Sequence, residues 1–110
     1  MSHQFCDYLI DQLSFWSPVT ARKMFGGYGI YRAGLMFGLI ADNQFYLKVD
    51  DSNRADFVAL GSEPFSYAAK GKKVTLSYWH LPEDVLEDTE QLSAYAEKAY
   101  AVALRARKNA

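Results

Sequence analysis

The sequence has 110 residues, which fits one domain, and half of them are hydrophobic, enough for a sizeable core. Twelve basic residues balance thirteen acidic ones, and the formal charge of -1 argues against a polyanion binder that works through bulk charge. The single cysteine, Cys6, excludes an intramolecular disulfide, and the sequence has neither a signal peptide nor the roughly 20-residue apolar run of a membrane span. We therefore expect one cytoplasmic domain over residues 1–110, with no membrane contact.

An amphipathic helix is predicted over residues 3–16. Its apolar side chains recur at helical spacing on one face: Phe5, Tyr8, Leu9, Leu13 and Trp16. Ser2 can cap its start, and Ser17-Pro18 ends it because a residue before proline avoids the helical conformation.

Three short strands are predicted next, as an antiparallel meander. They are Lys23–Tyr31, Leu35–Ala41 and Gln44–Val49. The last of these alternates, with Phe45, Leu47 and Val49 on one face and Gln44, Tyr46 and Lys48 on the other. The glycine- and aromatic-rich run Met24–Tyr31 is interpreted as a buried strand, because a hairpin loop at Arg32-Ala33-Gly34 follows it. Leu35–Ala41 is apolar on both faces, so both are expected to be covered.

The second half predicts a short helix, a hairpin and a long helix. Asp50-Asp51-Ser52 offers N-cap candidates for the short helix, which ends at Gly61. The hairpin joins Phe65–Ala69 to Val74–Trp79 through a turn at Lys70-Gly71-Lys72. Its alternation places Tyr78 on the apolar face and Trp79 on the opposite face. Pro82 can start a helical turn over Glu83–Leu86, after which Asp88 or Thr89 caps the last helix. The fold class is thus α+β, with about five antiparallel strands in two hairpin or meander units and three main helices, in the order α-βββ-α-ββ-α.

The glycines of Phe25–Gly29 do not match a phosphate-binding loop. A dinucleotide fingerprint needs a helix after its glycines, whereas a strand is predicted here, and the Gly-Lys-Ser/Thr of a P-loop is absent. An RNA-binding strand with stacking aromatics is the nearest alternative, but the basic residue expected just before the run is missing. We interpret the glycines as positions of close packing or a bulge.

No catalytic, metal or cofactor site is predicted. Three soft ligands, His3, Cys6 and His80, are too few for a structural zinc site. Ser77 and His80 would point to opposite faces of a strand, and no nucleophile motif supports Cys6 with His80. An acidic cluster over residues 83–90 lies at helix starts, where negative charge is favoured. We therefore expect a protein that is not an enzyme.

Candidate contact residues come from basic groups and exposed aromatics. The basic groups are Arg22-Lys23, Lys70 with Lys72 and Lys73, and Arg105 with Arg107 and Lys108. If the fold gathers them they can contact phosphates, and otherwise they form a solvated surface. Trp79 is expected either to meet a second core layer or to bind a partner, including a second copy in a homodimer.

Four sets of residues together match the pattern of a known family. They are Arg22–Tyr31 followed by Met36-Phe37, Tyr46–Asp50, Gly61–Phe65, and Ser77-Tyr78-Trp79 with Leu81-Pro82-Glu83. In this order and spacing they resemble the TfoX (Sxy) N-terminal domain family. The resemblance extends over roughly residues 15–105. It implies an α+β fold related to secretion chaperones and a bacterial regulator of competence genes that acts with other transcription factors, with no enzymatic activity. Those regulators carry a second, C-terminal domain, whereas this sequence stops at Ala110. We therefore expect a stand-alone form of the N-terminal module, with an excised fragment as the alternative.

Two functional hypotheses follow. The first is a non-enzymatic regulatory module that acts through protein–protein contacts, with the transcription machinery or with itself. The alternative is direct nucleic-acid binding through basic hairpin ends, with Tyr28 or Tyr31 stacking on bases. The candidate contact residues are Lys23, Phe25, Tyr28, Lys70, Lys72, Lys73 and Trp79.

Overall fold

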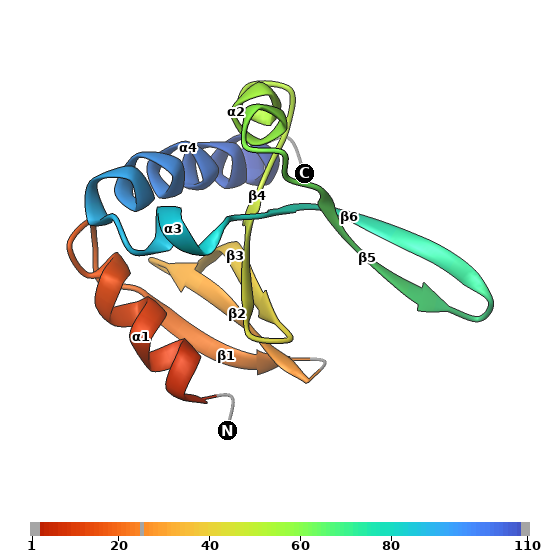
Figure 1. Cartoon of the computed structure of the whole chain (residues 1–110), viewed down its shortest axis with the longest axis horizontal. Coiled ribbons are helices and arrows are strands. Elements are labelled where there is room, and N and C mark those ends of the chain that lie inside the picture. The colour runs from red at the N-terminus through yellow and green to blue at the C-terminus, as the bar shows by residue number, and fades with distance from the viewer. Residues whose placement is uncertain (1–2, 25, 109–110) are drawn as a thin grey trace.

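The structure, a computed structural model, describes residues 3–24 and 26–108, which form four helices and six strands (Figure 1). In chain order they are α1 (His3–Leu13), β1 (Thr20–Met24), β2 (Gly27–Arg32), β3 (Leu35–Ala41), β4 (Gln44–Lys48), α2 (Arg54–Ala59), β5 (Pro64–Ala69), β6 (Lys72–His80), α3 (Glu83–Leu86) and α4 (Thr89–Lys108). All neighbouring strands are antiparallel, in the spatial order β1-β2-β3-β4-β6-β5. The predicted α+β class with an antiparallel sheet is confirmed.

The run Met24–Tyr31 is not one strand, and this part of the prediction is wrong. Met24 pairs with Gly27, so the chain reverses between them, and Gly26 lies in this turn at φ +79. Such a conformation favours glycine, which is what a tight hairpin turn requires. The sheet therefore has six strands rather than about five. Phe25 and the expected cap Ser2 lie outside the described residues.

Close packing explains the next glycine. Gly27 is buried in β2, and a Cβ atom added to it would fall on the backbone carbonyl oxygen of Ile40 in β3. Backbone atoms of a central strand cannot move aside without breaking the ladder, so only glycine fits. The interpretation of these glycines as positions of close approach is confirmed at Gly27.

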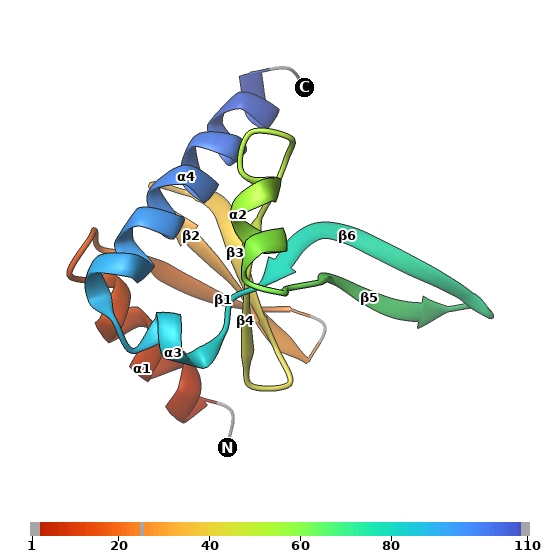
Figure 2. The same ribbon diagram turned by 45° about the horizontal axis from the view of Figure 1, so that its top comes forward.

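The hydrophobic core lies between one face of the sheet and the helices (Figure 2). Its fully buried members come from helices and strands alike: Leu9 and Leu13 of α1, Phe57 of α2, Leu92, Ala96 and Ala99 of α4, and Ile30, Phe37, Phe45 and Leu47 of the sheet. The alternation predicted for Gln44–Val49 is confirmed, because Phe45, Leu47 and Val49 are all buried. The helices pack chiefly on β1, β3 and β4.

A β-bulge in β3 brings an additional large ring into this core. Ile30 pairs with Gly38 but Tyr31 pairs with Met36, so Phe37 is the extra residue between them. Its ring is fully buried and meets Trp16 and Tyr100 edge-on, with centroids 5.4 and 5.9 Å away. The bulge lets Phe37 turn toward the helices while Met36 keeps its place on the opposite face.

Helices cover only one face of the sheet, yet both faces of Leu35–Ala41 are covered at the centre of the strand, as predicted, because Phe37, Leu39 and Ile40 are all buried. Leu39 pairs with Gly29 and Tyr46 on the face away from the core, and it does not belong to the core cluster. Leu39 is nevertheless buried, with only 7% of its surface exposed. Side chains of neighbouring strands, rather than a second helical layer, therefore shield this face.

Strands β5 and β6 form a two-stranded ribbon that projects from the body of the molecule (Figures 1 and 2). Strand β6 pairs with β4 only through Tyr78, Trp79 and His80, whereas its outer part pairs with β5 alone. The predicted hairpin is thus confirmed, and its tip stands clear of the helices. We call β5, β6 and the turn at residues 70–71 the ribbon.

Local signals placed the ends of the later helices with one error. Asn53, rather than a residue of Asp50-Asp51-Ser52, occupies the N-cap position of α2. Asp50 instead accepts hydrogen bonds from the backbone N–H and the hydroxyl of Ser52, which closes the preceding turn. Asp88 caps α4 as predicted, because its carboxylate accepts from the backbone N–H groups of Glu90 and Gln91 at 3.1 and 3.2 Å.

Candidate interaction surfaces

Charge is distributed unevenly between the sheet and the rest of the molecule. The strands carry six basic side chains: Arg22, Lys23, Arg32, Lys48, Lys72 and Lys73. None of the strands contains an aspartate or glutamate, and all thirteen acidic residues lie in helices, turns and loops. The near-neutral formal charge therefore conceals a basic sheet, and the argument from bulk charge does not apply to it.

The face of the sheet away from the helices carries aromatic, thioether and basic side chains. We call it the open face. Its members, read from the strand register and side-chain contacts, are Arg22, Met24, Tyr31, Met36, Leu39, Tyr46, Lys48, Tyr78 and His80. Gly29 lies among Met24, Tyr31 and Met36, and a Cβ atom there would approach both methionine sulfurs within 3.2 Å. The side chains of this face thus close over the backbone without a helix above them.

Ring contacts order the open face. The guanidinium carbon of Arg22 lies 5.3 Å from the ring centroid of Tyr31, and Lys48 Nζ lies 5.0 Å from that of Tyr78. Tyr46 meets His80 and Phe65 edge-on at 5.6 and 5.0 Å. Phe65 and Tyr67, which is 46% exposed, continue this aromatic surface along the ribbon. The cations lie over ring faces, an attractive cation–π geometry.

Burial shifts the titration of this face. It raises the pKa of Tyr78 to about 12, with a smaller contribution from the charge of Tyr31. Burial, and then the charge of Asp42, raise the pKa of Tyr46. Burial also lowers the pKa of the His80 imidazole. The phenols of Tyr78 and Tyr46 and the imidazole of His80 are therefore held in their uncharged forms.

The tip of the ribbon gathers three of the candidate basic residues. Lys70 lies in the turn, and Lys72 and Lys73 begin β6, all three exposed. Within the described residues none of their side-chain ammonium groups makes a hydrogen bond or ion pair. Their positive charges are not neutralised by the protein itself.

The other candidates are dispersed. Lys23 is exposed on β1, at the opposite edge of the sheet from the ribbon. Tyr28 and Trp79 are half-buried and pack against the core from the helix-covered face, whereas Tyr31 lies on the open face. The structure does not bring the basic hairpin ends and Tyr28 into one site.

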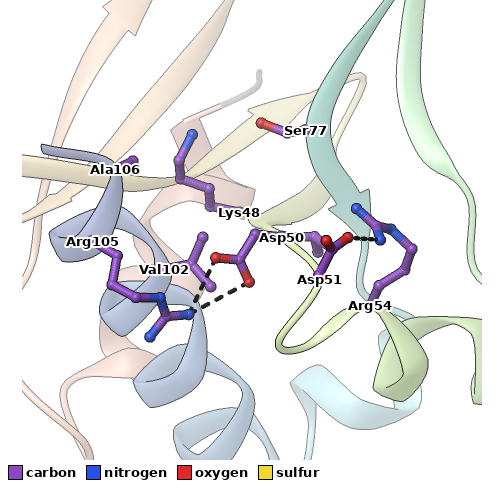
Figure 3. A pocket seen from close by; sticks show the side chains of 9 residues that line it. Lys48, Asp50, Asp51, Arg54, Ser77, Val102, Arg105 and Ala106 are labelled. Atoms are coloured by element: carbon purple, nitrogen blue, oxygen red, sulfur yellow. Dashed lines mark hydrogen bonds and ion pairs between the residues drawn. The ribbon is translucent and has the colours of Figure 1, made fainter. Parts of the chain in front are cut away.

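A hollow of about 440 Å³ lies where β4 ends beside α2 and the last turns of α4 (Figure 3). Arg105 donates to Asp50 Oδ2 at 3.2 Å and to Ser52 Oγ at 2.6 Å, and Arg54 pairs with Asp51. Hydrogen bonds from Ser52, followed by the contact with Arg105, hold the pKa of Asp50 below its usual value. Two of the basic side chains of the hollow are thus committed to the loop at residues 50–53, so we interpret it as a structural junction.

The described residues offer little for chemistry. Cys6 is 4% exposed, and burial together with the charge of Asp7 raises the pKa of its thiol, the opposite of what activates a nucleophile. No group of three or more His, Cys, Asp or Glu residues within the described chain is arranged to hold a metal ion. None of the helices there combines the length and apolar character that crossing a membrane needs.

Sequence reasoning missed most of the open face, in particular Met24, Met36, Tyr46, Phe65 and Tyr67. One signal was available, because the alternation of Gln44–Val49 already places Tyr46 and Lys48 away from the core. A second was the absence of carboxylates from every strand, which is readable once the strands are bounded. Which strands lie side by side in the sheet depends on the pairing of β4 with β6, and the sequence alone did not predict that pairing.

These observations define an α+β domain with an open, carboxylate-free sheet and a projecting basic ribbon. The chain belongs to the TfoX N-terminal domain family, whose model matches residues 11–103. It is also similar to the DNA transformation protein TfoX1 of Aliivibrio fischeri, with 34% identity over 62 residues. That match covers 56% of this chain and 30% of the relative, so the chain corresponds to only part of that protein. The family predicted from the sequence is confirmed.

Proposed function

We propose that this chain is a non-enzymatic regulatory module of bacterial DNA transformation. It acts in the transcriptional control of competence genes by binding a protein of the transcription machinery. Membership of the TfoX N-terminal domain family and the similarity to a DNA transformation protein support the biological process. The family is one of competence regulators rather than of known enzymes, which supports a role in binding.

The open face is the observation that carries this proposal. Protein interfaces are enriched in tyrosine, methionine and arginine, and this face presents Tyr31, Tyr46, Met24, Met36 and Arg22. Half-buried rings fixed by neighbouring contacts lose little conformational freedom when a partner covers them. Because the strands contain no carboxylate, the complementary partner surface is acidic.

The test compares two double variants in a naturally transformable bacterium that lacks its own copy of the gene. Tyr31→Ser with Tyr46→Ser alters the open face. Tyr8→Ser with Phe15→Ser alters exposed rings of α1 and the following turn, which are 40% and 72% exposed. Transformation frequency and competence-gene transcripts are measured, with the melting temperature of each purified protein as the folding check.

The wild-type and α1-side proteins are expected to restore transformation, and the open-face variant to fail although it is folded. Restoration by the open-face variant would contradict the proposal, as would a gene deletion that leaves transformation unchanged. Sedimentation of the purified proteins identifies the third outcome. If the wild type forms a dimer that the open-face variant loses, the partner is a second copy, and the assignment to the transcription machinery is wrong.

A further inference from the structure

The ribbon is a two-stranded element without cover. From Ser66 to Thr75 its strands pair only with each other. Only the inner end joins the body of the molecule, where the Ser77 carbonyl oxygen accepts from the Val49 N–H and Tyr78, Trp79 and His80 pair with β4. An isolated two-stranded hairpin is marginally stable in water, so an extended ribbon that projects from a domain calls for a binding role. Figures 1 and 2 both show it pointing away from the helices.

The charged residues of the ribbon are all basic. From Pro64 to His80 it contains three lysines and no aspartate or glutamate. All three lysines, Lys70, Lys72 and Lys73, lie at the tip, where they are exposed and make no ion pair among the described residues. Unpaired lysines at the end of a projecting element complement a polyanion.

The tip is also narrow. Ala68, Ala69 and Gly71 are its other residues, so no bulky side chain widens it. Paired strands lie about 4.8 Å apart, whereas the major groove of duplex DNA is roughly 12 Å wide and admits a two-stranded ribbon. The ribbon fits this groove in width.

The two faces of the ribbon differ in a way that suits the groove. One face, which we call the hydroxyl face, carries Ser66, Ala68, Lys73, Thr75 and Ser77. Ser66 Oγ and Thr75 Oγ1 lie 3.2 Å apart. Hydroxyl groups and lysine are common donors to phosphates and base edges. The other face, with Tyr67, Val74 and Leu76, continues the aromatic open face.

We propose that the ribbon binds duplex DNA. Its hydroxyl face enters the major groove, and Lys70, Lys72 and Lys73 contact the phosphates on either side. Binding weakens as the salt concentration rises and depends little on the DNA sequence, because contacts with the phosphates supply most of the binding free energy. The proposal goes beyond the regulatory role above, since it concerns a different surface and a different class of ligand. It also replaces the sequence-based alternative, in which Lys23 and Tyr28 shared the site.

The test is fluorescence anisotropy with a labelled duplex of about 20 base pairs, a length that spans two helical turns of about 10.5 base pairs each. Titrations are made at low salt and along a sodium chloride series. The arm variant is Lys70→Gln with Lys72→Gln and Lys73→Gln. The control is Lys23→Gln with Arg107→Gln and Lys108→Gln, which removes the same charge from exposed positions elsewhere.

The wild type and the control are expected to bind the duplex at low salt, and the arm variant about tenfold or more weakly, with a salt slope smaller by about three. An equal loss of duplex affinity in both variants would show that binding depends only on the net charge of the protein, and it would overturn the proposal. No binding by the wild type at low salt, or tighter binding to the single strand, would also overturn it. A dimer that only the arm variant loses, without duplex binding, would assign the ribbon to a second copy.

Either result can be separated from the regulatory proposal. Duplex binding is measured on the purified chain, whereas the open-face variants are scored by transformation and retain all three tip lysines. The tip lysines make no ion pair among the described residues, so the arm variant is expected to keep the wild-type melting temperature. Weak binding by a folded arm variant therefore reports on the ribbon itself.

Discussion

Tyr78 and Trp79 are neighbours in β6, and their rings lie on opposite faces of the sheet. Trp79 pairs with Leu47 and packs against the core, whereas Tyr78 pairs with Lys48 and lies beneath the ammonium group of that lysine at 5.0 Å. One strand thus supplies both the core and the open face at the point where the ribbon leaves the sheet. Substitutions at these two positions separate folding stability from surface properties.

Tyr78 is expected to make the protein less stable at alkaline pH. Its folded-state pKa is raised to about 12 from an ordinary value of 10.0, mainly by burial. Between these values the unfolded chain loses the phenol proton while the folded chain retains it, so stability falls as pH rises. After allowance for partial solvent exposure, the loss amounts to about 2 kcal/mol by pH 12.

Urea unfolding at pH 9 and pH 11.5 measures this effect, with Tyr78→Phe as the test variant. Phenylalanine keeps the ring but has no proton to lose, so this variant should lose less stability over that interval than the wild type. Tyr46 also has a raised pKa and contributes to the remaining slope. An identical loss in wild type and Tyr78→Phe would show that Tyr78 does not titrate as the structure implies.

The bulge in β3 gives a second prediction, because it places adjacent residues on opposite faces. Phe37→Ala should lower the free energy of unfolding by about 3–5 kcal/mol, since a fully buried ring between Trp16 and Tyr100 is lost. Met36→Ala, on the open face, should cost about 1 kcal/mol. Equal costs in urea denaturation would mean that Phe37 is not the residue turned into the core.

The two glycines at the first hairpin are expected to respond differently to substitution. Gly27→Ala should destabilise by about 3 kcal/mol, because the added methyl group overlaps the carbonyl oxygen of Ile40. Gly26→Asn is the matched control, since its Cβ meets no atom within 4 Å and asparagine tolerates positive φ. Thermal unfolding distinguishes them. If Gly27→Ala melts with the wild type, β2 and β3 are not packed as closely as the structure has them.

Local chemistry in the sequence predicted much of the fold. The period-two pattern at Gln44–Val49 placed Phe45 and Leu47 in the core, and Asp88 was one of the two residues named as candidate caps of the last helix. The proline at position 82 marked the start of α3. Each of these depends on interactions within a few residues, which is why a single sequence contains them.

Longer-range packing decided what the sequence did not reveal. The turn at Gly26 was hidden inside the run Met24–Tyr31, because its glycines were interpreted as positions of close packing and only the pairing of Met24 with Gly27 reveals the turn. The bulge at Phe37 depends on the space between Trp16 and Tyr100, which come from distant segments. The faces of Tyr78 and Trp79 were assigned the wrong way round, since both residues are aromatic and only the pairing with β4 separates them.

The candidate surfaces also divide into local features, which the sequence predicted, and long-range arrangements, which it did not. The lysines at positions 70, 72 and 73 form one group because a tight turn joins them, and that is a local property. Lys23 was grouped with them from its position at a hairpin end, but the strand order β1-β2-β3-β4-β6-β5 puts it at the far edge. Strand order follows from pairing between segments some thirty residues apart, for which the sequence carried no signal.

The contact between Arg105 and Asp50 gives the last prediction, because it ties the end of α4 to the loop before α2. Arg105→Gln should lower the free energy of unfolding by about 0.5–1 kcal/mol, as expected for an exposed ion pair, and by less at high salt. The pKa of Asp50 is depressed, so this stabilisation is present above its ordinary value of 3.8 and is lost as pH falls through the folded pKa. Arg107→Gln, two residues along the helix and exposed, is the control and should have no effect. Urea unfolding over a series from pH 7 down to pH 2 measures both variants. An Arg105→Gln cost that does not decrease anywhere along this series would mean that the arginine stabilises the helix end through packing rather than through the carboxylate of Asp50.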